Sequence, residues 1–288
     1  MKIAVGIPTF GRPDILAATL TELGRQSRPP DSIVVCGASE SDYRGCASVL
    51  SDVIAITAGQ GSSPQRNAIL RRADADVVVF FDDDFIPHPS YLAAIEQEMQ
   101  RDPSIVVATG LVLADGIKGP GLSIDAARKI VAEHTVVDGE VRPAFNGYGC
   151  NMAVRVAPVR QNGIWFDERL PLYAWQEDVD LSRRLRQFGG IVRIESACGV
   201  HLGVKSGRGS GVRLGYSQIA NPLYLSRKKQ GYPLRRALTH LAKNMAINVL
   251  RSLRPEPYVD RRGRLRGNIL AFRDLLTGRM EPERVLEL

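Results

Sequence analysis

The sequence predicts an α/β fold with a mixed, mostly parallel sheet flanked by helices. Two observations lead to this prediction. Over the first 115 residues, short apolar runs alternate with segments whose apolar residues recur at helical spacing. Glycine, proline or aspartate follows each apolar run closely, as expected where strands end. The 288 residues are 44% hydrophobic and 24% charged, a globular composition that excludes a disordered tail protein, a collagen-like chain and a disulfide scaffold.

The first half of the chain contains regular strand and helix signals. The predicted strands are Lys2–Pro8, Ser32–Cys36, Val53–Thr57 and Val77–Phe81. The predicted helices are Asp14–Gln26, Pro64–Arg72, with Ser62 or Ser63 as its cap, and Ser90–Arg101. Ligands of parallel sheets bind beyond the carboxyl ends of the strands, so we expect functional residues directly after each apolar run.

The second half gives a weaker pattern at first. Residues 116–175 are rich in Gly, Pro and Asn and predict loops and short strands. A helix is predicted over Glu177–Phe188, with Val179, Leu181, Leu185 and Phe188 facing inward. A strand follows over residues 190–200, and further helices are predicted at Val212–Gln230, Leu234–Leu253 and Arg264–Leu276.

Several features bear on location. No apolar run reaches the roughly 18 residues of a membrane span. The apolar run after Lys2 is too short for a signal peptide. The four cysteines form no CxxC pair, which favours a reducing compartment. We therefore expect a cytoplasmic protein.

The charge is unevenly distributed. Residues 1–200 hold 20 Lys and Arg against 25 Asp and Glu, whereas residues 201–288 hold 18 against 6, a balance of +12. Three interpretations of this basic tail are open: a solvated helix face, an anionic membrane surface and a nucleic acid.

Asp82, Asp83 and Asp84 directly follow the most apolar predicted strand. Three adjacent carboxylates repel one another, and a divalent cation with phosphate oxygens relieves that repulsion. The alternative is a solvated acidic turn that caps the next helix. The cluster favours a metal or phosphate site.

A second acidic group, Glu177 and Asp178, opens a predicted helix. The helix dipole explains one acid there, and Asp180 fits that role, but it explains an adjacent pair less well. Facing a pocket, Asp178 would accept a proton from an incoming hydroxyl. His201 is either an ordinary polar residue or a further ligand of a Mn²⁺ site.

The stretch from Gly59 to Asn67 lacks the Gly-Lys-Ser/Thr ending of a phosphate-binding loop and the third glycine of the dinucleotide fingerprint. Its useful residues are Arg66 and Asn67, where a guanidinium would meet a phosphate or ribose oxygen. No GxSxG or HExxH motif supports a serine hydrolase or a zincin.

An ordered set of motifs resembles family 2 glycosyltransferases, which are inverting enzymes of the GT-A fold. The motifs are Ile7-Pro8-Thr9-Phe10-Gly11-Arg12, Arg66-Asn67, Phe80-Phe81-Asp82-Asp83-Asp84, Asn151-Met152-Ala153 and Glu177-Asp178-Val179-Asp180-Leu181. The resemblance implies a GT-A catalytic domain over residues 1–230, divided into a nucleotide-sugar half (1–115) and an acceptor half (116–230). Residues 231–288 form a basic helical extension.

The resemblance also implies roles for the motif residues. The nucleotide-sugar site is expected to comprise Pro8, Thr9, Phe10, Arg12, Ser39, Arg66, Asn67, Asp82 and Asp83. Asp84, Asp82 and His201 are the expected ligands of Mn²⁺ or Mg²⁺. Asp178 is the expected base that deprotonates the acceptor hydroxyl, with Glu177 beside it in the Glu-Asp motif.

Acceptor binding is expected at Asn151, Gly149 and Trp175, although Trp175 equally suits core packing. The acceptor itself is open among polysaccharide, cell-envelope, glycolipid and natural-product glycans. One departure concerns the donor. The family's second strand usually ends in an Asp that contacts the base, whereas this chain has Val35-Cys36-Gly37-Ala38-Ser39. The donor base is therefore open among UDP, dTDP and GDP.

The basic tail carries an apolar stripe over Leu234–Leu253, with basic residues on its other faces. Such a helix either packs on the catalytic domain or lies in a membrane interface beside a lipid-linked acceptor, on the inner face of the membrane. Two rival functions remain: a sugar-phosphate nucleotidyltransferase and a nucleic-acid-binding protein. The first would need a glycine-rich loop with a signature lysine, and the second lacks aromatic residues interleaved with its cations, so no nucleic acid is expected.

Overall fold

The computed structural model describes residues 1–137, 139–205 and 209–288. Its described residues form one sheet in the order β3-β2-β1-β4-β8-β6-β9-β5, with β7 paired to β9. The strands are β1 (Ile3–Pro8), β2 (Ser32–Gly37), β3 (Val53–Thr57), β4 (Val77–Phe81), β5 (Phe85–Pro87), β6 (Ile105–Asp115), β7 (Val141–Pro143), β8 (Asn151–Arg155) and β9 (Gly190–His201). Strands β1 to β4 pair in parallel, and β8 is antiparallel to both β4 and β6. The mixed α/β sheet predicted from the sequence is confirmed.

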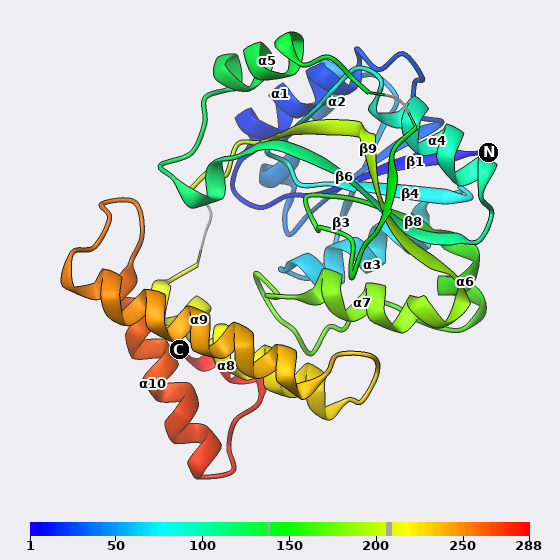
Figure 1. The fold of residues 1–288 in the computed structure, drawn as a ribbon. Helices are drawn as coiled ribbons and strands as arrows, with labels where there is room; N and C mark the ends of the chain where they lie inside the picture. The colour runs from blue at the N-terminus through cyan, green and yellow to red at the C-terminus, as the bar shows by residue number, and fades with distance from the viewer. Residues whose placement is uncertain (138, 206–208) are drawn as a thin grey trace.

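Helices cover both faces of this sheet (Figure 1). They are α1 (Pro13–Leu23), α2 (Cys46–Val49), α3 (Ser62–Arg72), α4 (Tyr91–Arg101), α5 (Ile124–Glu133), α6 (Val156–Gln161) and α7 (Glu177–Leu185). Alternate strand residues face opposite layers. Val5 joins a core with α1 and α4, whereas Ala4 joins one with α3, α6 and α7. The sheet is therefore buried on both faces and its strand ends are held rigidly.

Three expectations about helices are wrong. Helices α5 and α6 lie inside the region predicted as loops and short strands. Helix α3 begins after Gly61, whose φ of 132° suits glycine, rather than at a serine cap. Phe188 lies in a 3₁₀ turn after α7 and is 39% exposed, because α7 has already ended at Leu185.

The C-terminal helices form a separate layer beside the sheet (Figure 1). They are α8 (Gly211–Arg227), α9 (Leu234–Leu253) and α10 (Arg261–Leu276). Helices α8 and α10 cross with their backbones in contact, since a Cβ on Gly215 or Gly267 would lie 2.0 Å from a carbonyl oxygen of the other helix. Helix α8 packs on α10 and α9, and its Tyr216 also shares a core with Ala174 and Val179. None of the described helices has both the length and the hydropathy to cross a bilayer.

Candidate active site

The Asp82–Asp84 turn leaves β4 at the carboxyl edge of the sheet, where the loop after β1 meets it. Asp83 is fully buried; it accepts a hydrogen bond from Thr9 Oγ1 at 2.7 Å and pairs with Arg12 at 2.6 Å. Burial and the neighbouring carboxylate of Asp84 raise the pKa of Asp83 to about 7, against the opposing effect of Arg12. Asp83 thus ties the two strand ends together rather than facing solvent.

Asp82, Asp84 and His201 form the one group among the described residues whose ligand atoms gather as a metal site requires. One atom from each lies within 4.8 Å of the others. His201 ends β9, and its Nε2 lies 3.3 Å from Asp84 Oδ1. Two carboxylate oxygens and one imidazole nitrogen suit Mn²⁺ or Mg²⁺, with the nitrogen better tolerated by Mn²⁺. The residues present therefore fit a divalent cation.

A second layer of side chains orients this cluster. His201 Nδ1 pairs with Asp115 Oδ1 at 2.9 Å, and Tyr148 donates to the other Asp115 oxygen at 3.1 Å. Such an outer carboxylate fixes which ring nitrogen faces the metal. Asp84 also accepts from the Val204 N–H at 2.8 Å.

These contacts set the charges of the cluster. Burial opposes ionisation of Asp84, but its hydrogen bond to His201 and the nearby cations lower its pKa to about 2. Burial also opposes the imidazolium, yet hydrogen bonds to Asp115 and Asp84 raise the pKa of His201 to about 10. Asp84 and His201 therefore stabilise each other as an ion pair, and a divalent cation held here would compete with the imidazolium proton.

Arg66 lies at the centre of the remaining acids. This α3 side chain is buried, pairs with Glu177, and donates to Asp82 Oδ1 at 2.9 Å and to the Gly149 carbonyl at 3.0 Å. Its guanidinium also lies over the ring of Phe166, 5.6 Å from the centroid. Burial raises the pKa of Glu177 to about 7, although Arg66 opposes that shift. A buried guanidinium needs such partners, and here it connects the metal cluster to the Glu-Asp pair.

Asp178 is held in one orientation at the start of α7. Its Oδ2 accepts from the Gly149 N–H at 2.9 Å, and its Oδ1 accepts from the Val179 N–H at 2.7 Å. Burial raises the pKa of Asp178 above its usual value, while these backbone donors and Arg66 oppose the rise. Gly149 lies between Asp178 and Arg66, because a Cβ there would be 3.2 Å from the guanidinium. The carboxylate is therefore fixed and half-buried at the same strand edge.

The chain just before Glu177 is strained. Leu172, Ala174 and Gln176 all have positive φ, at 58°, 52° and 74°, although none is glycine. The Trp175 carbonyl accepts from Asn221 of α8 at 2.9 Å, and the Trp175 ring lies 6.4 Å from the exposed ring of Tyr173. This segment connects the acids to the C-terminal helices.

The structure brings most of the predicted residues together and places others at the neighbouring strand ends. The joined set is Thr9, Arg12, Arg66, Asp82, Asp83, Asp84, Gly149, Glu177, Asp178 and His201. Pro8 ends β1, Phe10 is 40% exposed just beyond it, and Ser39 follows β2.

Two expected contacts need correction. Asn67 is engaged outside the group of site acids: its Nδ2 donates to the Phe166 carbonyl and to Glu168, its Oδ1 accepts from the Phe166 N–H, and it is 1% exposed. Asn151 is fully buried in β8 and accepts from Thr109 at 2.7 Å, so it offers no surface to an acceptor. Both are structural residues in this fold.

The sequence patterns did not indicate three residues that support the site, namely Asp115, Tyr148 and Asp42. Asp42 is buried and accepts from the N–H groups of Gly11, Ala38 and Ser39 at 2.8–2.9 Å. A carboxylate therefore does lie beside the end of β2, contributed by the turn that follows it. Its signal was the Ser-x-x-Asp spacing of a capping box, and the signal of Asp115 was its place after an apolar run.

The sheet order and the acidic cluster at the strand ends agree with the GT-A fold that the sequence motifs imply. The family model described as Glycosyl transferase family 2 matches residues 4–161, just over half of the chain. The chain therefore belongs to that family, which favours glycosyl transfer over the two rival functions. The match includes Arg66 and Asp82–Asp84, whereas Glu177, Asp178 and His201 lie beyond it.

Solved structures agree on the fold. S. aureus TarS 1–349 is 15% identical with a TM-score of 0.56, over 88% of this chain and 73% of that one. The same TarS fragment with UDP-GlcNAc is 14% identical with a TM-score of 0.57, over 89% and 77%. The Pyrobaculum calidifontis mannosyltransferase PcManGT, in complex with GDP-Man and Mn²⁺, is 16% identical with a TM-score of 0.58, over 99% and 85%. A search of curated proteins gives no match.

Proposed function

We propose that the protein transfers a sugar from a nucleoside-diphosphate sugar to an acceptor hydroxyl with inversion, using a divalent cation and Asp178 as general base. The observation that carries the proposal is the pairing of two sites at one strand edge. The Asp82–Asp84–His201 cluster suits a cation with a diphosphate, and the fixed carboxylate of Asp178 is linked to it through Arg66 and the backbone of Gly149.

On the donor side, Asp82, Asp84 and His201 would hold Mn²⁺ or Mg²⁺, which when bound neutralises the charge of the departing diphosphate. Arg12 stays paired with Asp83 and so keeps the β1 and β4 loops in place around the nucleotide. Asp115 and Tyr148 would keep His201 turned toward the cation.

On the acceptor side, Asp178 would take the proton of the acceptor hydroxyl. The acceptor oxygen then forms a bond to the anomeric carbon as the carbon–oxygen bond to the diphosphate breaks on the opposite face. One displacement of this kind inverts the anomeric configuration. Two backbone donors fix the carboxylate, and its raised pKa makes it a stronger base than an exposed aspartate.

Glu177 and Arg66 would act on Asp178 indirectly. Glu177 is paired with Arg66, and Arg66 bonds to the Gly149 carbonyl while the Gly149 N–H donates to Asp178. Trp175 and Tyr173, just before the acids, offer ring faces on which an acceptor sugar of a glycan or a lipid-linked glycan would stack.

The donor base is proposed to lie against the loops after β1 and β2, between Phe10 and Ser39. Asp42 holds these loops together through backbone N–H groups. UDP, dTDP and GDP are the candidates. The related fold is found with UDP-GlcNAc in TarS and with GDP-Man in PcManGT, so the architecture itself accepts either base.

The first experiment measures the thermal unfolding shift with UDP, dTDP, GDP and CDP, with and without Mn²⁺, for the wild type and Asp84→Asn. A ligand at 100 times its dissociation constant stabilises the fold by about 2.7 kcal/mol. We expect a Mn²⁺-dependent shift with one nucleotide, lost in Asp84→Asn. NMR of the product then gives the anomeric configuration. Absence of any nucleotide shift, or a retained configuration, would overturn the proposal.

A further inference from the structure

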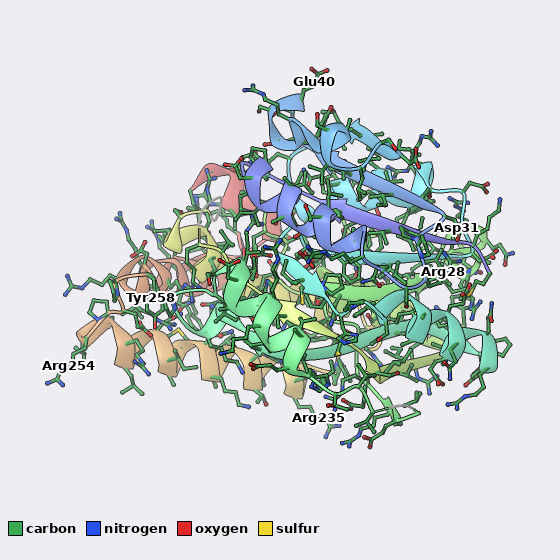
Figure 2. All side chains as sticks on the ribbon, turned by 90° about the horizontal axis from the view of Figure 1, so that it is seen from above. Arg28, Asp31, Glu40, Arg235, Arg254 and Tyr258 are labelled. Atoms are coloured by element: carbon green, nitrogen blue, oxygen red, sulfur yellow. The ribbon has the colours of Figure 1, made fainter. Side chains whose placement is uncertain are left out.

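Helix α9 leaves several large apolar side chains exposed on its outer face. Leu234, Leu238, Leu250 and Leu253 are 56%, 50%, 68% and 78% exposed, whereas the buried residues of the helix are Ala237 and Asn248. Leu241 and Met245 of the apolar stripe pack against the core that α9 shares with α8 and α10, whereas the four leucines remain exposed. Figure 2 shows α9 along the outer edge of the molecule, with Arg235 and Arg254 at its two ends.

A buried amide network fixes this orientation. Asn248 is 1% exposed, and its Nδ2 donates to Gln218 of α8 and to Asn268 of α10, both at 2.8 Å. Asn268 in turn donates to the Gly215 carbonyl at 2.6 Å. Turning the leucines inward would break these bonds and leave buried amides unpaired, at a cost that keeps the leucines outside.

The outward face is also basic. From residue 234 to 253 the chain contains no Asp or Glu, and Arg235 and Lys243 are exposed among the leucines, as is Arg254 just past the helix end. Helix α10 has an exposed row of its own, which consists of Arg262, Arg266, Ile269, Arg273 and Leu276. Apolar groups flanked by cations, without acids, are the pattern of a helix lying in the headgroup region of an anionic bilayer.

We propose that the outer face of α9 is a membrane-binding surface whose occupant is an anionic lipid bilayer. The exposed leucines extend from the first to the last residue of the 20-residue helix, about 30 Å at 1.5 Å per residue, which suits a flat surface rather than a pocket. A second copy of the chain is disfavoured, because a self-facing α9 would bring Arg235, Lys243 and Arg254 against like charges.

The surface has a direct structural link to the proposed acceptor side. Ala174 and Val179, on either side of Glu177, share an apolar core with Tyr216 of α8 and Ala271 of α10. Asn221 of α8 holds the Trp175 carbonyl. Resting on the proposed function, this packing would present the acceptor side to a hydroxyl carried on a lipid. Membrane binding itself does not depend on that function.

The test is cosedimentation of the full-length protein with vesicles of equal phosphatidylglycerol and phosphatidylethanolamine, against phosphatidylcholine vesicles. Leu238→Glu combined with Leu250→Glu removes the apolar contact, and Phe188→Glu, an exposed apolar residue after α7, is the matched control. We expect binding to the anionic vesicles only, reduced at least about tenfold by the double variant and unchanged by the control. Arg235→Gln with Lys243→Gln should weaken it about fivefold per cation at low salt.

Two results would overturn the proposal: no binding of wild type to anionic vesicles at low salt, or equal binding of wild type and the double variant. A concentration-dependent dimer in sedimentation velocity, lost in the double variant without vesicle binding, would assign the face to a second copy instead. Circular dichroism checks that each variant is folded. Nucleotide binding with Mn²⁺, measured on the same samples, separates failure of the surface from failure of the proposed enzyme.

Discussion

The strand-end site and the outer face of α9 are both rich in charge, but they hold it differently. At the site, Arg66 and Asp83 are buried, and each bonds to side chains from other segments of the chain. On α9, Arg235 and Lys243 are exposed and the helix itself carries no acid. Buried, bonded charges have one geometry and suit chemistry on particular atoms. Exposed cations among leucines suit a partner without fixed geometry.

Asp178→Asn should have the largest effect and tests the fixed side of this comparison. The asparagine keeps the shape but cannot take a proton, so kcat should fall about 10²- to 10⁴-fold while nucleotide binding is unchanged. Asp125→Asn, an exposed acid on α5, is the matched control and should leave kcat unaltered. The measurement is sugar transfer under saturating donor. A loss under threefold would remove Asp178 from the mechanism.

Arg66→Met should cost the most stability. Removing the guanidinium leaves Glu177 and Asp82 facing each other without a cation, and breaking a buried ion pair costs about 3–5 kcal/mol. Arg235→Met on α9 removes the same charge from an exposed position and should change the free energy of unfolding by about 0.5 kcal/mol or less. Urea unfolding of both variants measures the contrast. Similar losses of unfolding free energy in the two variants would mean that the ion pairs of Arg66 do not stabilise the folded state.

Asn248→Ala should have an intermediate effect on the other region. It removes the donor that the side-chain oxygens of Gln218 and Asn268 share, and the acceptor of Arg261, at a cost of about 1–3 kcal/mol. Asn244→Ala on the same helix is the control, because the buried Nδ2 of Asn244 has no partner to lose. Thermal unfolding compares the two. Equal losses would contradict a specific role of the network in orienting α9.

The first four strands were predictable because each combines a β-branched run with a residue that ends it. Helix α5 was predictable in principle, from the cap at Ser123 and the inward spacing of Ala127 and Val131, but the surrounding glycines and prolines outweighed that signal. Which apolar residues of α9 remain exposed was not predictable. Periodicity defines a face, whereas the partners of Asn248 on two other helices decide what the face meets.

The site shows a similar division. The acidic groups were recognisable in the sequence because adjacent carboxylates repel one another unless a cation offsets their charge. The structure places them at one edge of the sheet. Asn67 was predicted in the nucleotide-sugar site because it follows Arg66 in the sequence. Successive helix residues point about 100° apart, however, so its side chain faces another segment. Asp115 supports His201 from a strand 86 residues away in sequence, a relation that no local pattern contains.

The pH dependence of transfer should give the smallest and most diagnostic effect. Burial raises the pKa of Asp178 above the usual 3.8 and that of Glu177 to about 7. A base must be ionised to accept a proton, so activity should fall as pH drops through the raised pKa, tenfold per pH unit below it. The midpoint of the acid limb in kcat/KM should therefore lie above pH 3.8.

Two controls make this prediction decisive for Asp178. Doubling a saturating Mn²⁺ concentration leaves the midpoint in place if the limb belongs to the base, but moves it downward if protons compete with the metal at His201. Glu177→Gln keeps the limb if Asp178 is the titrating group and abolishes it if Glu177 is. The decisive result is an acid limb that persists in both tests while the affinity for vesicles stays constant over the same pH range. The group that controls activity would then belong to the buried site and not to α9.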